Sequence, residues 1–238
     1  SKEKIHQFIM DYHIDMTSFQ EKEYVSFNDF FYRKINPESR PVCQDSLSVV
    51  SPADGKVLVF PDIKHQNFII KGYQLHMDEF LQNDTLAELF DHASVMIFRL
   101  CPSDYHRYHF PVSGEVILES QVDGDYYSVS PIALRKKIEL MTMNKREFTL
   151  IESPIFGSVL MMEVGATMVG SMIRTFEDSW IEKGEEKGYF KFGGSTVVLL
   201  FEEGAIKIDQ DLMENSAQGI ETELKMGEQV AFKALINY

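Results

Sequence analysis

Short apolar runs separated by glycine, proline and aspartate fill the chain after Pro41. Runs of this length and composition predict β-strands, at residues 56–60, 67–75, 94–100, 114–122, 125–129, 147–153, 158–173, 195–201, 205–209 and 230–236. They follow one another closely and lack the regular intervening helices that a parallel sheet needs. The pattern therefore predicts an α+β fold, β-rich and mainly antiparallel.

The first forty residues (1–40) carry helical patterns instead. Apolar residues recur at three- and four-residue spacing on one face of a short predicted helix, at Ile5, Phe8, Ile9 and Tyr12. Packing on the rest of the domain is favoured over membrane contact for this face. Ser26 is the predicted N-cap of a second helix, which Pro37 and Pro41 end. One further helical pattern, at 77–90, interrupts the strands.

Length, charge and cysteine content narrow the class of protein. With 238 residues and 44% hydrophobic content, the chain is predicted to form one domain over residues 1–238. A net charge of −14 argues against a nucleic-acid partner and gives little general attraction to anionic lipid. No apolar run approaches about 18 residues, so a soluble or peripheral protein is expected. Cys43 and Cys101 lack metal-ligand spacing, which favours free thiols in a reducing compartment.

Two segments place charged and titratable side chains between predicted strands. In SPADGKV, Asp54 precedes a strand, with an ordinary Asp-Gly turn as the alternative interpretation. The loop CPSDYHRYHFPVSG contains Asp104, His106, Arg107 and His109, and its histidines suit proton transfer. No third ligand accompanies the two histidines, so no metal is expected. Arg107 either attracts a substrate anion or forms a structural bridge with Asp104, and the bridge is slightly favoured.

Ser195 follows Gly193 and Gly194 and begins the predicted strand 195–201. A serine that caps a strand after a Gly-Gly turn is the plain alternative. The stretch GGSTV does not match the G-x-S-x-G elbow of serine hydrolases, since Val197 replaces the last glycine and a strand follows instead of a helix. A Gly-Ser bond in a tight turn favours another chemistry, in which the hydroxyl attacks the preceding carbonyl with help from a histidine and an aspartate.

Three motifs then stand in order along the chain: SPADGKV, LCPSDYHRYHFPVSG and GYFKFGGSTVVLLF. Together with SFNDFFYRKI, YSVSPIAL, NKRE and VGATMVGS, they resemble the phosphatidylserine decarboxylases, pyruvoyl enzymes made as a single proenzyme. The resemblance covers most of the chain. It implies that Ser195 attacks the Gly194 carbonyl, that the resulting ester eliminates the chain ending in Gly194, and that hydrolysis with loss of ammonia leaves a pyruvoyl group. The products would be a β subunit, 1–194, and an α subunit, 195–238.

The same resemblance assigns roles to individual side chains. Asp54 and His109 match the aspartate and histidine of the self-cleavage triad, with His109 as the base and Asp54 holding its tautomer. The pyruvoyl group from Ser195 would act as the electron sink while phosphatidylserine loses carbon dioxide and becomes phosphatidylethanolamine. His106 matches the first histidine of the family's pair and is expected to protonate the product carbon.

The resemblance also implies a setting for the protein. We expect a barrel-sandwich core related to lipoyl-carrier domains and a homodimer. The two unpaired cysteines and the lack of a signal-peptide pattern fit a protein that contacts the cytoplasmic face of a bacterial membrane peripherally. The helix face of Phe8 and Ile9 is the apolar patch expected to be shared in the dimer or to touch lipid.

Two alternatives remain open from the sequence. The longer apolar N-terminal region of many family members is absent, which leaves a soluble relative that decarboxylates free tryptophan-type amino acids. The chain could also fold without maturing and serve as a binding module or scaffold. The presence of Asp54, His109, Gly194 and Ser195 together argues against that second alternative.

Overall fold

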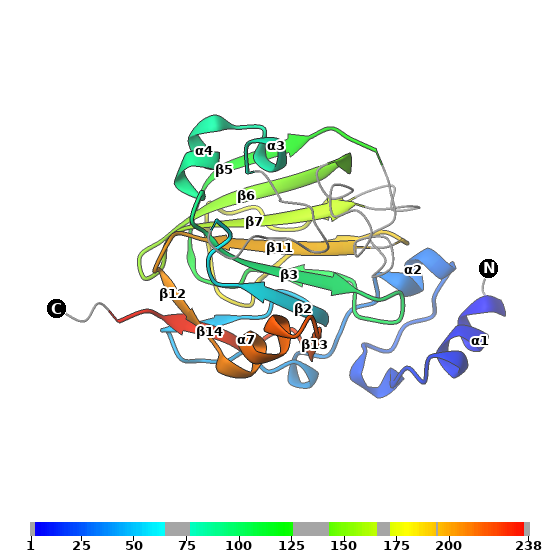
Figure 1. Cartoon of the computed structure of the whole chain (residues 1–238). Coiled ribbons are helices and arrows are strands. Elements are labelled where there is room, and N and C mark those ends of the chain that lie inside the picture. Colours follow the sequence, from blue (N-terminus) through cyan, green and yellow to red (C-terminus); the bar gives the residue numbers. More distant parts are fainter. Residues whose placement is uncertain (1–2, 65–76, 126–142, 166–171, 194, 236–238) are drawn as a thin grey trace.

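The computed structural model describes residues 3–64, 77–125, 143–165, 172–193 and 195–235 (Figure 1). Its largest element is an eight-stranded antiparallel sheet. In spatial order the strands are β13 (Thr222–Leu224), β2 (Gly55–Phe60), β3 (Ser94–Leu100), β11 (Ser195–Phe201), β7 (Gly157–Gly165), β6 (Arg146–Ser153), β5 (Gly114–Val122) and β9 (Trp180–Ile181). The prediction of a β-rich, mainly antiparallel α+β fold is confirmed.

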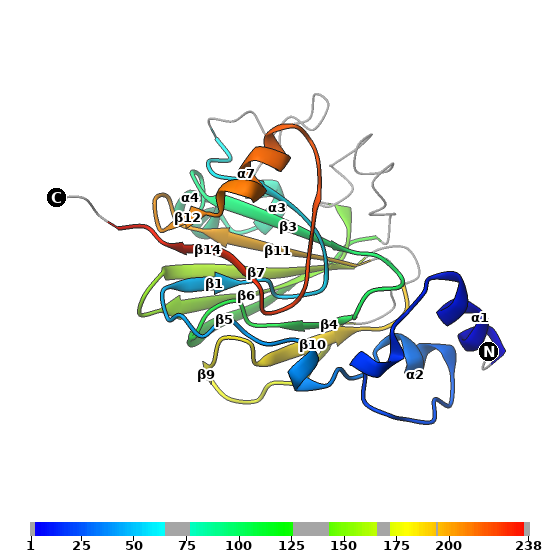
Figure 2. The ribbon, with the colours of Figure 1, turned by 90° about the horizontal axis from the view of Figure 1, so that it is seen from below.

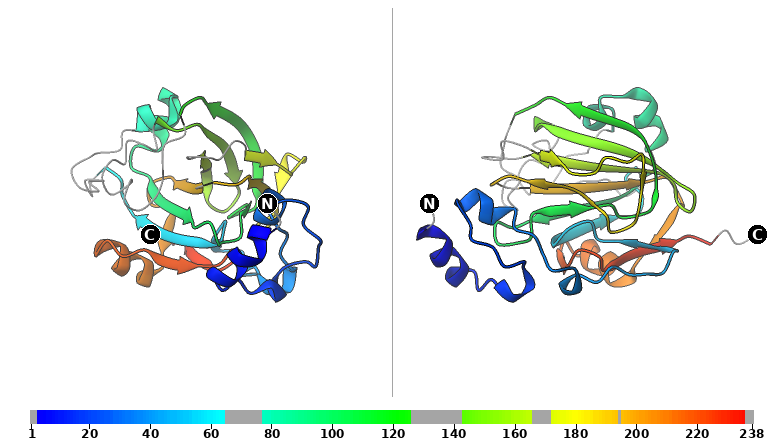
Figure 3. Two further views of the ribbon diagram at one scale, coloured as in Figure 1. Left: turned by 90° about the vertical axis from the view of Figure 1, so that its right-hand side faces the viewer. Right: turned by 180° about the vertical axis from the view of Figure 1, so that it is seen from behind.

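Two smaller antiparallel sheets pack on one face of the large sheet (Figure 2). The first contains β1 (Ser48–Val50), β14 (Gln229–Lys233) and β12 (Ile206–Ile208). The second contains β4 (Arg107–His109), β10 (Glu186–Phe190) and β8 (Met172–Arg174). Seen along its strands, the large sheet curves around the core (Figure 3). Its edge strands β13 and β9 do not pair with each other among the described residues, so no closed barrel is formed there.

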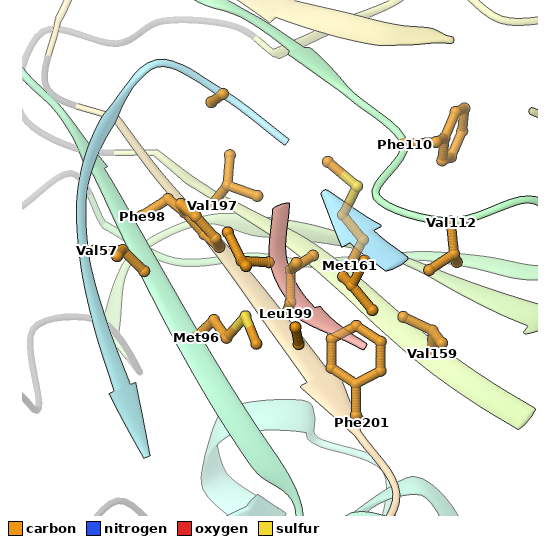
Figure 4. Close-up of a cluster of buried hydrophobic side chains, with 14 of the residues drawn as sticks. Val57, Met96, Phe98, Phe110, Val112, Val159, Met161, Val197, Leu199 and Phe201 are labelled. Carbon is orange, nitrogen blue, oxygen red and sulfur yellow. The ribbon is translucent and has the colours of Figure 1, made fainter. Parts of the chain in front are cut away.

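Strand β11 lies at the centre of the large sheet because its sequence, STVVLLF, is apolar on both faces after the first two residues. All seven of its residues are buried, between β3 on one side and β7 on the other. Val197, Leu199 and Phe201 face the small sheets, in the cluster that Figure 4 shows. Val198 and Leu200 face the opposite side, toward the two helices that cover it. A continuous apolar run is typical of a strand buried on both faces.

The helices are short and lie outside the sheets (Figure 1). They are α1 (Glu3–Asp11), η1 (Met16–Ser18), α2 (Phe27–Phe31), η2 (Pro37–Ser39), α3 (Met77–Leu81), α4 (Asp84–Leu89) and α7 (Gln210–Ala217). Among the residues described, no helix has the length and apolarity that a membrane crossing requires.

The N-terminal predictions are mostly confirmed. Ser26 caps α2, since its side chain accepts a hydrogen bond from the Asp29 backbone nitrogen at 3.1 Å. The expectation that Pro37 and Pro41 end this helix is wrong, because α2 already ends at Phe31. Helix α1 is present, and its Phe8 ring packs against the aromatic rings of α2 with centroids as close as 5.1 Å. This contact agrees with the expectation that α1 packs on the domain.

Several elements differ from the sequence prediction. The predicted helix at 77–90 is two helices, α3 and α4, because Asn83 caps the second one. Residues 107–109 form strand β4 instead of part of a loop, and α7 has no counterpart among the predicted helices. The predicted strand at 67–75, residues 126–129 of another and 166–171 of a third lie outside the described residues.

Candidate active site

Ser195 is the first residue of β11 and is fully buried, as the strand prediction required. It stands in register with Leu100 of β3 on one side and with Gly165 of β7 on the other. Its Oγ atom has no hydrogen-bond partner among the described residues. A buried hydroxyl without a partner costs about 1–3 kcal/mol, so this atom is a candidate for chemistry rather than for stability.

The backbone just before Ser195 is unusual. Gly193 has φ 151°, a conformation that residues with a side chain rarely adopt. Gly194, the predicted cleavage residue, lies outside the described residues. Two contacts from α2 hold the chain just upstream: Asn28 Oδ1 accepts the Phe192 backbone N–H at 2.9 Å, and the Phe31 ring meets the Phe192 ring edge-on at 5.0 Å. Helix α2 therefore fixes the segment that leads into Ser195.

His106 lies between β3 and β4, and its side chain is completely buried. Its Nδ1 is 2.9 Å from the Asp104 carbonyl oxygen. Because a carbonyl oxygen only accepts, Nδ1 carries the proton in the neutral ring and Nε2 carries a lone pair. Nε2 has no partner among the described residues. Burial lowers the pKa of His106 to about 3, so the ring is neutral at physiological pH.

Helix α2 and strand β10 bring His106 toward the start of β11. The His106 ring stacks on the Phe31 ring at 3.8 Å, and Phe31 also contacts Phe192. The His106 carbonyl accepts a hydrogen bond from the Phe190 backbone N–H at 3.0 Å. Ser195 follows Phe192 by three residues. At one end of the large sheet the structure thus collects two buried polar groups, His106 Nε2 and Ser195 Oγ, neither of which has a partner in the part of the chain that the structure describes.

His109 lies at the end of β4 and both of its ring nitrogens have partners. Nδ1 is 2.8 Å from the Gly184 carbonyl oxygen and therefore donates to it. Nε2 then accepts from the Tyr105 hydroxyl at 3.1 Å. Burial lowers the pKa of His109, so this ring is also neutral. Its backbone nitrogen donates to the Pro52 carbonyl at 2.8 Å, which ties β4 to the SPADGKV turn.

Asp54 is buried just before β2. Its carboxylate accepts hydrogen bonds from Arg40 and from the Met226 backbone, and not from His109. Arg40 Nε donates to Oδ1 at 2.8 Å and Nη2 donates to Oδ2 at 2.5 Å, while the Met226 backbone nitrogen donates to Oδ1 at 2.9 Å. Asp54 therefore acts on His109 through its electric field, which raises the pKa of that ring but less than burial lowers it. The sequence prediction missed Arg40, since nothing in PESRP marks it. The next residue, Gly55, has no room for a side chain, because a Cβ atom there would lie 2.7 Å from the Arg99 carbonyl oxygen.

Arg107 has a structural role, as the slightly favoured interpretation held, but with a different partner. Its Nη1 pairs with Glu186 Oε1 at 2.7 Å, and its Nε donates to the Tyr32 carbonyl at 3.0 Å. The expected bridge to Asp104 is wrong. Asp104 Oδ2 instead accepts the Cys101 backbone N–H at 2.7 Å and closes the turn after β3. Cys43 and Cys101 are free thiols, as predicted.

The neutral His106 makes stability depend on pH. Its pKa is about 3 in the folded chain and near 6.5 in an unfolded one, so below about pH 6.5 only the unfolded chain gains the proton. Stability is therefore lost as the pH falls. Between pH 7 and pH 5 the loss from this group is about 2 kcal/mol. Urea unfolding of the uncleaved Ser195→Ala chain at the two pH values measures it.

His106→Asn in the same background is expected to remove that share of the pH dependence, whatever it does to stability at pH 7. His6→Asn is the matched control, because His6 is exposed on α1. An equal pH dependence with and without His106 would contradict the assignment of a neutral buried ring.

Comparison with known proteins identifies the family of the chain. A family model described as phosphatidylserine decarboxylase matches residues 27–232. A phosphatidylserine decarboxylase proenzyme of Clostridium botulinum (strain Kyoto / Type A2) is 46% identical over 237 residues, which are 98% of this chain and 80% of that protein. Proenzymes of the same name from Fusobacterium nucleatum and Clostridium novyi are 43% and 44% identical, over 96% and 98% of this chain and 77% and 80% of those proteins.

The chain belongs to the phosphatidylserine decarboxylase family. The resemblance that the ordered motifs carried is thereby confirmed. The family match includes the turn with Asp54, the segment with both histidines and the Gly-Ser junction at 194–195.

Proposed function

We propose that this chain is a proenzyme that cleaves itself at Gly194-Ser195 and then decarboxylates phosphatidylserine to phosphatidylethanolamine. The observation that carries the proposal is the buried Ser195 hydroxyl, which has no hydrogen-bond partner among the residues that the structure describes. It lies two residues after Gly193, whose φ of 151° suits glycine, and it occupies the serine position of the Gly-Ser bond in the motif. The names of the relatives, all phosphatidylserine decarboxylase proenzymes, support the substrate.

In self-cleavage, His109 is the base. Because its pKa is lowered by burial, its Nε2 lone pair is available at neutral pH. That lone pair accepts a hydrogen bond from the Tyr105 hydroxyl. For the ring to take the Ser195 proton, the Tyr105 side chain either turns away or relays the proton to the ring. Asp54, fixed by Arg40, stabilises the histidine cation that forms. Cleavage yields residues 1–194 and 195–238.

The residues around Ser195 fit a pyruvoyl group made from it. The position is buried, and its hydroxyl has no hydrogen-bond partner among the described residues. When formed, the group supplies a conjugated carbonyl that accepts the electron pair released with carbon dioxide. In the resting neutral ring Nε2 of His106 carries a lone pair and has no partner among the described residues, so it first takes up a proton and then delivers it to the product carbon. An anionic substrate nearby favours the charged ring and so opposes the effect of burial on the pKa of His106.

The substrate assignment has a direct test. Mature protein is expected to consume detergent-dispersed phosphatidylserine and to leave free tryptophan unchanged, as followed by carbon dioxide release. The Ser195→Ala chain is the blank for both reactions. Consumption of tryptophan alone would replace the first proposal by the soluble amino-acid decarboxylase that the sequence left open.

The setting of the enzyme is proposed on the same basis. We expect a homodimer that contacts the cytoplasmic face of a bacterial membrane peripherally. Phe8 and Ile9 are half-buried, and the exposed apolar side chains next to them are Met10 and Tyr12. The relation of the core to lipoyl-carrier domains also stays a prediction, and the curved large sheet with two small sheets against it is compatible with one.

A further inference from the structure

A second buried group on the same face of the large sheet has no role in the mechanism above. Glu163 of β7 forms an ion pair with Lys187 of β10, with Oε2 and Nζ 2.5 Å apart. Both side chains are buried, at 2% and 5% exposure. The other carboxylate oxygen, Oε1, has no hydrogen-bond partner among the described residues. Half of this buried carboxylate is thus unsatisfied, which a purely structural ion pair does not require.

Strand register places Glu163 next to the nucleophile. Side chains alternate along β7, so Glu163 and Gly165 face the small sheets, as Met161 does. Ser195 faces the same way, because it is two residues from Val197 on β11. Gly165 stands opposite Ser195, and Val197 stands opposite Glu163.

Glu163 is therefore the diagonal neighbour of Ser195 on one face of the sheet. Diagonal neighbours on adjacent strands are about 7–8 Å apart. The residue directly opposite Ser195 on β7 is Gly165, which has no side chain to separate the two. Beyond Gly165, the nearest β7 side chain on this face is that of Glu163, which is within reach of a small group held at Ser195.

Glu163 also lines a cavity of about 300 Å³ between the large sheet and the small sheet of β4, β10 and β8. The charged and titratable groups around it are Lys187, Glu147 directly opposite on β6, Tyr108 on β4, Glu119 on β5 and Arg174 on β8. Burial, with smaller contributions from Glu147 and Glu119, raises the pKa of Glu163 to about 7, although Lys187 lowers it. A carboxylate with this pKa both accepts and releases a proton near neutral pH.

The proposed reaction needs such a group. The amine of phosphatidylserine arrives as an ammonium ion, which has no lone pair with which to attack a carbonyl. Resting on the proposed function, we propose that Glu163 is the base that takes this ammonium proton. The N–H bond breaks, its electron pair stays on nitrogen, and the proton moves to the free Oε1, which leaves a neutral amine and a neutral carboxyl. Lys187 is a positioning residue that holds Oε2 and keeps Oε1 free.

Glu163→Gln tests this inference, because the amide keeps the shape and an oxygen for Lys187 but does not accept the proton. The variant is expected to cleave itself like the wild type, as seen by intact mass. Its kcat/KM for phosphatidylserine at pH 7 is expected to fall by about 10²–10⁴, the usual range for a lost general base. Wild-type kcat/KM should fall below about pH 7 as Glu163 gains a proton, and the variant should lack this limb of the profile.

Glu152→Gln is the matched control, since Glu152 lies on the neighbouring strand β6 but is exposed and stands opposite Ser158, far along the sheet from Glu163. Its kcat/KM is expected to match that of the wild type. A readout that does not depend on turnover is carbon-13 NMR of glutamate carboxyls in the uncleaved Ser195→Ala chain. One resonance should titrate near neutral pH there and be missing when Glu163→Gln is added.

Three results would overturn the inference. The first is a cleaved Glu163→Gln enzyme with wild-type kcat/KM and an unchanged pH profile, which makes the ion pair structural. The second concerns the case in which Glu163→Gln does not cleave itself. Glu163→Asp keeps a carboxyl, so it should cleave and its kcat/KM should still fall toward acidic pH. A cleaved Glu163→Asp enzyme without that fall overturns the role. The third is failure of both variants to cleave. A wild-type enzyme that does not consume phosphatidylserine would instead defeat the proposed function, and the NMR titration would still report on Glu163.

Discussion

A Ser195→Ala chain is expected to remain one uncut polypeptide of full mass, while the wild-type chain separates into residues 1–194 and 195–238. The substitution removes the hydroxyl that is proposed to attack the Gly194 carbonyl, so the effect is all or none. In the wild type, the smaller fragment should be lighter than a fragment that begins with serine by the mass of one ammonia molecule. Intact mass under denaturing conditions measures both the cut and the pyruvoyl group.

Thr196→Ala is the matched control for this experiment. Thr196 is the next residue, and its hydroxyl is also buried without a partner among the described residues. It points to the other face of the sheet, because side chains alternate along β11. The control should therefore cleave normally. An uncut wild-type chain would contradict the proposal and identify a stalled proenzyme or a scaffold.

Substitution of the two histidines is expected to separate cleavage from decarboxylation. His109→Ala should block cleavage, because it removes the base that is tied to the SPADGKV turn and lies in the field of Asp54. His106→Ala should cleave and then lose about 10²–10⁴ in kcat, the usual contribution of a general acid. Intact mass reports the first step, and carbon dioxide release from phosphatidylserine reports the second.

His92→Ala serves as the control. His92 lies just before β3, at the end of the large sheet that is opposite to Ser195. It should change neither step. If both active-site variants cleave normally and only His109→Ala loses turnover, the roles of the two histidines are exchanged. If His106→Ala also fails to cleave, its ring acts on the precursor as well.

Most of the sheet could be predicted from the sequence because local patterns encode it. The run STVVLLF is apolar on both faces and became the central strand β11. Strand β4 was missed because three residues with charged and aromatic side chains carry no apolar alternation, and β4 forms only by pairing with β10. Helix α7 was missed because its sequence, QDLMENSA, buries only Leu212.

The site was predicted as far as motifs reach. The motifs single out Asp54, His106, His109 and Ser195 as candidates; all four are buried in the structure, and their roles stay predictions. The motifs do not single out the partners of these residues, because the partners come from distant parts of the chain. Arg40 reaches Asp54 from a segment without a motif, and the expected bridge from Arg107 to Asp104 was wrong.

The sequence by itself determined the family, the candidate nucleophile and the antiparallel strands, because each depends on residues that are close together along the chain. The tertiary structure alone decided which groups are dry, paired or left without a partner. Burial made His106 and His109 neutral, and strand register put Glu163 on the same face as Ser195. Hydration and register are set by strands that meet across long stretches of sequence, so no local pattern encodes them.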